Sequence, residues 1–294
     1  METLIEKFEV TENLGFTLKN YDPDYSGDFS KDAAKEILND LKSELKDLQE
    51  KFYVNRSFSM LIILQAMDAA GKDSAIEHVM GGLNPQGCRV DSFKQPTSEE
   101  LRHDFLWRHS KTAPERGIIG IHNRSHYESV LVCKVHPELI LEETIPGYDT
   151  EDKIDKKFWD GRYESIKDFE KHLHRNGTII LKFFLNVSQK EQKERFLERI
   201  DDPQKNWKFS AGDIEERKHW KEYMKAYEEA ISKTSTSHAP WFVIPADKKW
   251  FARIAICSIL LDKLKSLSLK VPKLSDEEAK SLEYCKALLQ DEKD

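Results

Sequence analysis

The chain has 294 residues, of which 39% are hydrophobic and 34% are charged, and its formal net charge at pH 7 is −7. A chain of this length and composition can bury a substantial core, which excludes a disordered protein and predicts a soluble globular one. The negative net charge argues against a general nucleic-acid coat, but it allows a locally basic site for a polyanion.

Features that would direct the chain to a membrane or to secretion are not found in the sequence. No apolar run approaches the length of a membrane-spanning helix, and Met1–Lys7 does not have the pattern of a signal peptide. The cysteines are scattered and form no C-x-x-C pair: Cys88, Cys133, Cys257 and Cys285. We therefore expect a cytoplasmic protein with reduced cysteines and no membrane or nucleic-acid partner.

The order of the predicted elements is that of an α/β protein. The segment to about Ser30 shows no period and is expected to be irregular, whereas the apolar spacing of Lys31–Phe52 is helical, so residues 1–55 form a predicted N-terminal helical extension. Apolar strands follow, with helical patterns between them: Met60–Gln65, Arg89–Phe93, Ile118–His122, Thr178–Asn186 and Trp241–Ile244. This alternation predicts a parallel sheet with helices on both faces. No linker interrupts it, so we expect residues 1–294 to form a single domain.

The first strand leads into Ala66–Ser74, which has the features of a phosphate-binding loop. A strand, a short loop containing Gly71 and Lys72, and a helix N-terminus direct backbone N–H groups and a lysine at an anion. Two positions depart from G-x-x-x-x-G-K-[ST], because Ala66 replaces the first glycine and Asp73 replaces Ser or Thr. The alternative interpretation is an ordinary turn after a buried strand.

Asp68 lies inside this loop. A carboxylate beside a bound phosphate is repelled unless a cation lies between the two, so we expect Asp68 to bind magnesium or to orient an attacking phosphate. A turn-stabilising role is the alternative. The other candidate phosphate-binding residues of the segment are Ala69, Ala70, Gly71, Lys72, Asp73 and Ser74.

The strand Ile118–His122 ends in Asn123 and Arg124. Ligands of such sheets bind outside the carboxyl ends of the strands, so both side chains are expected to face the same crevice as Lys72. Asn123 offers a neutral oxygen to a metal, and the guanidinium of Arg124 suits a phosphate. The alternatives are a helix cap for Asn123 and a surface ion pair for Arg124.

The later segments predict a bridging helix, a lid and a terminal helix. Asp149–His174 is expected to form a helix between two strands. After the strand that ends at Asn186, residues 188–215 carry cations where nucleotide kinases place a mobile lid: Arg195, Arg199 and Lys208. A solvated helix of mixed charge is the alternative. Residues 270–294 are expected to form an amphipathic helix that serves as an arm or an oligomer contact.

Together these motifs resemble the polyphosphate kinase 2 family, over roughly residues 30–265. The matching segments include Leu64–Asp73, Asn84–Gly87, Ser92–Pro96, His103–Arg108, Pro114–Gly117, Asn123–Glu128 and Ile244–Trp250. The resemblance implies a three-layer P-loop kinase fold with a helical lid. It also implies reversible, Mg²⁺-dependent phosphoryl transfer between inorganic polyphosphate and adenine nucleotides, or guanine nucleotides, in a homo-dimer or homo-tetramer.

The resemblance also implies a role for each matching residue. The catalytic residues are Asp68, Lys72, Asn123 and Arg124, with magnesium at Asp68 and Asn123. Polyphosphate is expected on the loop, from Ala69 to Ser74, and on Arg195, Arg199 and Lys208. The nucleotide is expected on Lys94, Arg108 and Arg116. Many members carry Asp at the position of Asn123; Asn with this loop resembles the subgroup that phosphorylates both AMP and ADP.

The residues by themselves leave other functions open. An ATP-dependent nucleoside or thymidylate monophosphate kinase, an NTPase and a non-catalytic nucleotide-binding protein also carry such a loop. The sequence offers no cysteine or serine nucleophile with a paired base, so we expect direct phosphoryl transfer without a covalent enzyme intermediate.

Overall fold

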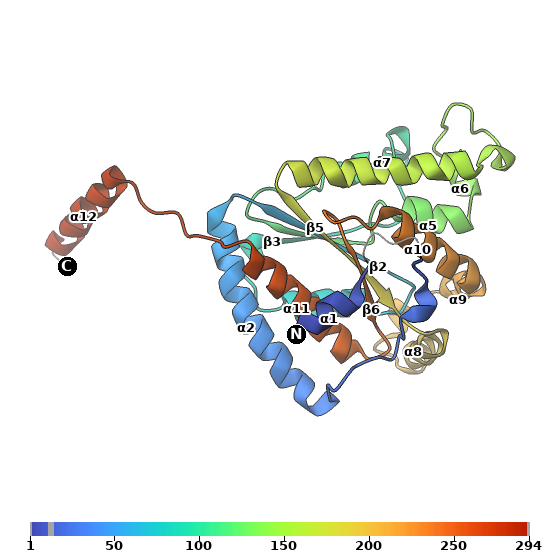
Figure 1. The fold of residues 1–294 in the computed structure, drawn as a ribbon, viewed down its shortest axis with the longest axis horizontal. Coiled ribbons are helices and arrows are strands. Elements are labelled where there is room, and N and C mark those ends of the chain that lie inside the picture. The colour runs from blue at the N-terminus through green and yellow to red at the C-terminus, as the bar shows by residue number, and fades with distance from the viewer. Residues whose placement is uncertain (1, 11–14, 293–294) are drawn as a thin grey trace.

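A six-stranded sheet forms the centre of the computed structural model, which describes residues 2–10 and 15–292 (Figure 1). Its strand order is β1-β6-β5-β2-β4-β3. The strands are β1 Glu9–Val10, β2 Ser59–Ala66, β3 Cys88–Ser92, β4 Ile119–Asn123, β5 Thr178–Asn186 and β6 Trp241–Pro245. Strands β2 to β6 pair in parallel, as the alternating pattern predicts.

Helices cover both faces of this sheet, which confirms the α/β prediction. In Figure 1, α2 and α11 lie together on one side of the sheet, and α7, α5 and α10 lie on the other. The α-helices are α1 Glu2–Phe8, α2 Lys31–Asn55, α3 Lys72–Met80, α4 Trp107–Ser110, α5 Glu128–Val135, α6 Glu138–Leu141, α7 Lys156–Arg175, α8 Gln189–Asp201, α9 Ala211–Lys218, α10 Trp220–Thr234, α11 Lys249–Ser266 and α12 Asp276–Asp291.

Two predictions for the start of the chain and the sheet are wrong: the segment before Ser30 is not wholly irregular, and the sheet is not wholly parallel. Residues 2–10 form α1 and the short strand β1, which pairs antiparallel with β6 at the edge of the sheet. Phe8 and Val10 are buried, and the ring of Phe8 packs edge-on against Tyr25 and Phe251. Two strand residues are too few to show a period, so only the contact with β6 defines this element.

The burial of the two central strands, β2 and β5, agrees with their apolar composition. Every residue of β2 and of β5 is buried, as expected for apolar, β-branched strands covered on both faces of a parallel sheet. On the flanking layer, the hydroxyl of Ser30 accepts a hydrogen bond from the N–H of Ala33 and so starts α2 where the pattern predicts.

Parallel pairing brings the carboxyl ends of the five strands β2 to β6 to one edge of the sheet. Leu64 of β2 lies in register with Asn123 of β4, and Ala66 with Leu185 of β5. The loop after β2, the turn after β4, the start of α8 after β5 and the start of α11 after β6 therefore meet at this edge. The expected lid consists of α8, a 3-10 turn at Asn206–Lys208, and α9.

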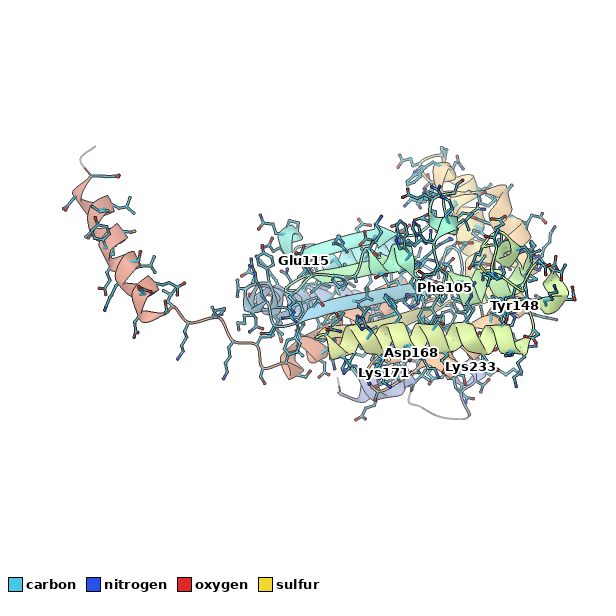
Figure 2. The ribbon with its side chains drawn as sticks, turned by 90° about the horizontal axis from the view of Figure 1, so that it is seen from above. Phe105, Glu115, Tyr148, Asp168, Lys171 and Lys233 are labelled. Carbon is cyan, nitrogen blue, oxygen red and sulfur yellow. The ribbon has the colours of Figure 1, made fainter. Side chains whose placement is uncertain are left out.

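The terminal helix α12 stands apart from the rest of the molecule, at the end of an extended segment (Figures 1 and 2). Its start is capped from within, because Ser275 and Glu278 form a reciprocal capping box. Within the described residues, no helix is both long enough and apolar enough to cross a membrane.

Candidate active site

The loop between β2 and α3 is bent by two residues with positive φ. Ala69 has φ 60° and Gly71, the N-cap of α3, has φ 109°. Glycine adopts such a backbone freely, whereas an alanine there costs roughly 1–2 kcal/mol. The loop therefore holds a conformation that its surroundings must stabilise. It lines a cavity of about 870 Å³, which we call the loop cavity.

Lys72 begins α3 and lies inside the loop. Its ammonium donates a hydrogen bond to the carbonyl oxygen of Ala66 at 2.9 Å. Burial lowers the pKa of Lys72 and the neighbouring Arg124 lowers it further, against the attraction of Asp68 and Glu128. An anion in the loop cavity would compensate this charge, as a phosphate-binding lysine requires.

Arg124 links the turn after β4 to the loop. Its Nη2 lies 2.9 Å from Asp68 Oδ1 and its Nη1 lies 3.8 Å from Glu128 Oε2. Burial lowers the pKa of Arg124, but Glu128 and Asp68 outweigh burial and the net shift is upward. In Glu128 burial is the larger effect and raises the pKa of the carboxyl, although Arg124 and Lys72 oppose it. The guanidinium is thus held charged at the loop cavity.

Asn123 ties the end of β4 to the start of α3. Its amide nitrogen donates to Asp73 Oδ1 at 2.6 Å, whereas helix α5 begins only at Glu128, with Tyr127 as its N-cap. Asn123 is therefore not the cap of that helix. In the same turn of α3, the hydroxyl of Ser74 accepts a hydrogen bond from Arg253 Nη2 at 2.7 Å.

The oxygen atoms that side chains provide at the loop can hold Mg²⁺ only if a bound phosphate and water supply the remaining oxygen ligands. The carboxylates of Asp68 and Asp73 and the amide oxygen of Asn123 are oxygen donors, which Mg²⁺ prefers. Among residues 2–10 and 15–292, no group of three or more His, Cys, Asp or Glu side chains has the arrangement to hold a metal ion. Mg²⁺ typically completes its shell with water and phosphate oxygens, so the residues fit a cation that binds with a phosphate.

The predicted lid cations differ in exposure and contact. Arg199 and Lys208 line the loop cavity, and Arg199 Nη1 lies 3.3 Å from the carbonyl oxygen of Lys208 and 3.9 Å from Asp213. Lys208 also places its ammonium 4.9 Å from the ring centre of Trp207. By contrast, Arg195 is only 4% exposed, and its guanidinium binds backbone carbonyl groups of the loop.

A second cavity, of about 410 Å³, adjoins the loop cavity; we call it the side cavity. Lys94 and Arg124 line both cavities, so they mark the junction. Arg108 lines the side cavity, where its Nη1 donates to the carbonyl oxygen of Lys94 at 2.9 Å and lies 3.3 Å from Glu100. Two of the three predicted nucleotide-binding residues therefore lie together.

Arg116 is not brought to either cavity. It precedes β4, at the amino end of the strand, whereas the cavities lie at the carboxyl ends. Figure 2 shows the neighbouring residue Glu115 on the side of the molecule nearer α12, and Phe105, which lines the side cavity, further toward the other end.

The structure also adds side chains that the sequence reasoning did not name. Lys249, the first residue of α11, and Lys205 line the loop cavity. Lys249 begins the helix that follows β6, whose last residue is Pro245, so the strand-end rule applied to that strand points to this segment. Gln192 of α8 donates to the carbonyl oxygen of Asp68 at 3.0 Å; nothing in its local pattern signals that contact.

Comparisons with known proteins agree on one family. The model of the family described as polyphosphate kinase 2 matches residues 28–272. The chain is 50% identical to an ADP-polyphosphate phosphotransferase of Rhodopseudomonas palustris over 81% of each chain. It is 43% identical to an AMP/ADP-polyphosphate phosphotransferase of Meiothermus ruber, over 91% of this chain and 96% of that one. The crystal structure of polyphosphate kinase 2 from Arthrobacter aurescens superposes with a TM-score of 0.85, at 41% identity over 95% of each chain.

Proposed function

This chain belongs to the polyphosphate kinase 2 family, and from that membership and the geometry of the site we propose that it transfers phosphoryl groups between inorganic polyphosphate and AMP or ADP. It is an enzyme, a polyphosphate-dependent nucleotide phosphotransferase with the P-loop kinase fold. The main support for separate donor and acceptor sites is that two cavities adjoin, with Arg124 and Lys94 lining both.

The loop cavity is the proposed donor site. A polyphosphate chain presents repeated anions, so it needs a track of cations. The basic side chains that line the cavity outnumber the acidic ones. Apart from Arg195, whose guanidinium is taken up by backbone carbonyl groups and Glu191, the basic ones are Lys72, Lys94, Arg124, Arg199, Lys205, Lys208 and Lys249, and the acidic ones are Asp68, Asp73, Glu77, Glu198 and Asp213. Such local focusing accommodates a polyanion although the net charge of the chain is −7.

The side cavity is the proposed acceptor site. It is large enough for a nucleotide, and its lining combines Lys94, Arg108 and Arg124 with apolar side chains such as Phe105 and Leu139 and with several carboxylates. The phosphates of the nucleotide are therefore expected near Lys94 and Arg124, where the two cavities meet. Arg124 stands at the junction, where the transferred group would pass from donor to acceptor. Phosphoryl transfer depends on in-line positioning and on neutralising the charge of the transition state, which this placement of a guanidinium favours.

Magnesium is the proposed metal, held by Asp68 and Asn123 together with phosphate oxygens. When bound, it neutralises phosphate charge beside Lys72 and Arg124. The amide nitrogen of Asn123 is used by Asp73, so its amide oxygen is the atom left for the metal. We expect direct transfer; a phosphorylated enzyme trapped with labelled polyphosphate would contradict it.

The decisive assay offers the enzyme long-chain polyphosphate, magnesium and either ADP or AMP, and follows the product nucleotides over time. We expect ATP from ADP and ADP from AMP. Transfer from ATP to a nucleoside monophosphate without any transfer from polyphosphate would instead establish a nucleoside monophosphate kinase. Hydrolysis of ATP without an acceptor would establish an NTPase.

A second assay tests the proposed link between Asn123 and the use of AMP. It compares the ratio of the rates with AMP and with ADP in Asn123→Asp with the same ratio in the unaltered enzyme. Guanine nucleotides, assayed in parallel, report the base preference.

We further propose that residues 1–294 act as one domain, with residues 1–55 as an extension and residues 188–215 as the lid, in a cytoplasmic homo-dimer or homo-tetramer. The large apolar side chains of α12, Leu282, Tyr284, Leu288 and Leu289, are all more than half exposed, and a helix of this length gains most of its stability from packing. Light scattering after gel filtration tests this by giving the number of subunits in the assembly. Truncation after residue 269 should lower that number, and an unchanged number of subunits would exclude α12 as the contact.

A further inference from the structure

Two side chains of α8 hold three consecutive carbonyl groups of the phosphate loop. Gln192 Nε2 donates to the carbonyl oxygen of Asp68 at 3.0 Å. Arg195 Nη1 donates to those of Ala69 at 2.9 Å and Ala70 at 2.8 Å. The backbone of the loop is therefore fixed from the lid side, residue by residue, over the stretch that contains the positive φ of Ala69.

The guanidinium of Arg195 has no donor left for a phosphate. A guanidinium carries five N–H groups. In addition to its two loop contacts, Arg195 donates through Nη2 to the carbonyl oxygens of Ala246 at 2.7 Å and Asp247 at 2.9 Å, and through Nε to Glu191 at 2.7 Å. All of its donors are used, and the side chain is 4% exposed.

Holding the carbonyl groups on the α8 side has a consequence for the loop cavity. A peptide unit has its C=O and N–H on opposite sides, so a fixed carbonyl also fixes the direction of the N–H group that follows it. Phosphate loops bind anions through such N–H groups. The same guanidinium also ties the loop after β2 to the segment after β6, and so connects two of the strand ends that form the site.

We propose that Gln192 and Arg195 are positioning residues, a clamp that sets the anion-binding conformation of the loop, and that Arg195 does not bind polyphosphate itself. The clamp also joins α8 to α9, because Arg217 of α9 donates through Nη1 to Gln192 Oε1 at 2.6 Å. Gln192 thus contacts the loop through its amide nitrogen and α9 through its amide oxygen. The role in transfer rests on the proposed function.

Conservative substitution separates a clamp from a charge contact. Arg195→Lys keeps the charge but not the five donors, whereas Arg195→Met removes both. We expect both variants to lower kcat by about 100-fold, because the loop is displaced, and to raise the KM for polyphosphate to the same extent in both, because retained charge does not restore the direction of the N–H groups. Arg199 is the matched control, since it lies one helical turn away and is 23% exposed. Arg199→Met should raise this KM, and Arg199→Lys should restore most of it.

Hydrogen exchange of the loop in the absence of substrate gives a second readout that does not depend on the donor. Peptides that cover residues 66–74 should exchange faster in Arg195→Lys, Arg195→Met and Gln192→Met, and at the unaltered rate in Arg199→Met. Gln192→Met also serves if the Arg195 variants do not fold. Unchanged exchange in the folded clamp variants, or an Arg195→Lys enzyme with near-normal kcat, would overturn the clamp. If the unaltered enzyme shows no transfer from polyphosphate, the proposed function fails, while the exchange experiment still decides the clamp.

Discussion

The turn between β4 and α5 contributes to two clusters of charged side chains, one fully buried and one partly exposed. On one side, Lys182 Nζ lies 2.6 Å from Glu170 Oε2 and also donates to the Tyr127 hydroxyl at 2.9 Å and the Thr234 carbonyl oxygen at 2.8 Å. Lys182 and Glu170 are both fully buried. We call this the core cluster.

The site cluster lies on the other side of the turn, where Arg124 contacts Asp68 and, at 3.8 Å, Glu128. The two glutamates show the difference: Glu170 is fully buried, whereas the side chain of Glu128 is 21% exposed. Burial raises the pKa of Glu170, but Lys182 and His126 outweigh it and the net shift is downward. In Glu128 burial prevails over Arg124 and Lys72, and the pKa is raised. The core cluster is internally compensated, whereas the site cluster keeps cations available for a ligand.

The largest expected effect comes from removing the charges that we propose to bind the ligand. Lys72→Ala and Asp68→Asn should each lower the rate of transfer by about 10³-fold or more, because the first removes the ammonium proposed to contact the phosphate and the second removes the carboxylate proposed to hold magnesium. The melting temperature of Lys72→Ala should change little, since the folded state no longer has to bury that ammonium. Steady-state rates and thermal denaturation measure both. Retained activity in either variant would remove that residue from the site.

Breaking the core cluster should lower the stability of the fold, whereas the Lys72→Ala change in the site cluster should lower activity with little change in stability. Lys182→Met leaves Glu170 buried without its ammonium partner, and removing one partner of a buried pair typically costs about 3–5 kcal/mol of unfolding free energy. Urea denaturation measures the loss. The double variant Lys182→Met with Glu170→Gln should recover much of it, because neither charge then remains. A loss below about 1 kcal/mol in the single variant would show that the core cluster is not a stabilising pair.

The smallest effect is a dependence on pH that has opposite signs in the two clusters. Because the pKa of Glu128 is raised above its ordinary 4.5, the folded state binds more protons than the unfolded state just above pH 4.5, and stability falls as the pH rises there. Glu128→Gln removes this loss, so its melting temperature relative to the unaltered protein should rise as the pH increases from about 4.5.

Glu170→Gln is the matched control for this titration. The lowered pKa of Glu170 gives stability that is complete above 4.5 and is lost as the pH falls below it. The variant should therefore be less stable than the unaltered protein at neutral pH, with the difference shrinking toward acid. Equal slopes for the two variants would contradict the contrast between the clusters.

Local sequence patterns were sufficient to predict which strands and loops form the site. The apolar strands, the Gly71-Lys72 loop start and the polar pair Asn123-Arg124 each signal their place within a few residues, and parallel strands bring their carboxyl ends to one edge. Arg116 was expected from the family resemblance alone; it lies on a matching segment but precedes β4 and lines neither cavity. Segment similarity does not say at which end of a strand a residue lies.

The sequence by itself determined the fold class, the phosphate loop and the meeting of Lys72, Asp68, Asn123 and Arg124, because strand and helix periods and the direction of parallel strands are local properties. Only the tertiary structure decided how each cation is used. Arg195 and Arg199 are four residues apart on one helical face, yet five acceptors take up all the donors of Arg195, whereas Arg199 is 23% exposed. Four of these acceptors belong to two segments that are distant in the chain, the loop after β2 and the segment after β6, and partners that distant leave no periodic pattern around the arginine itself.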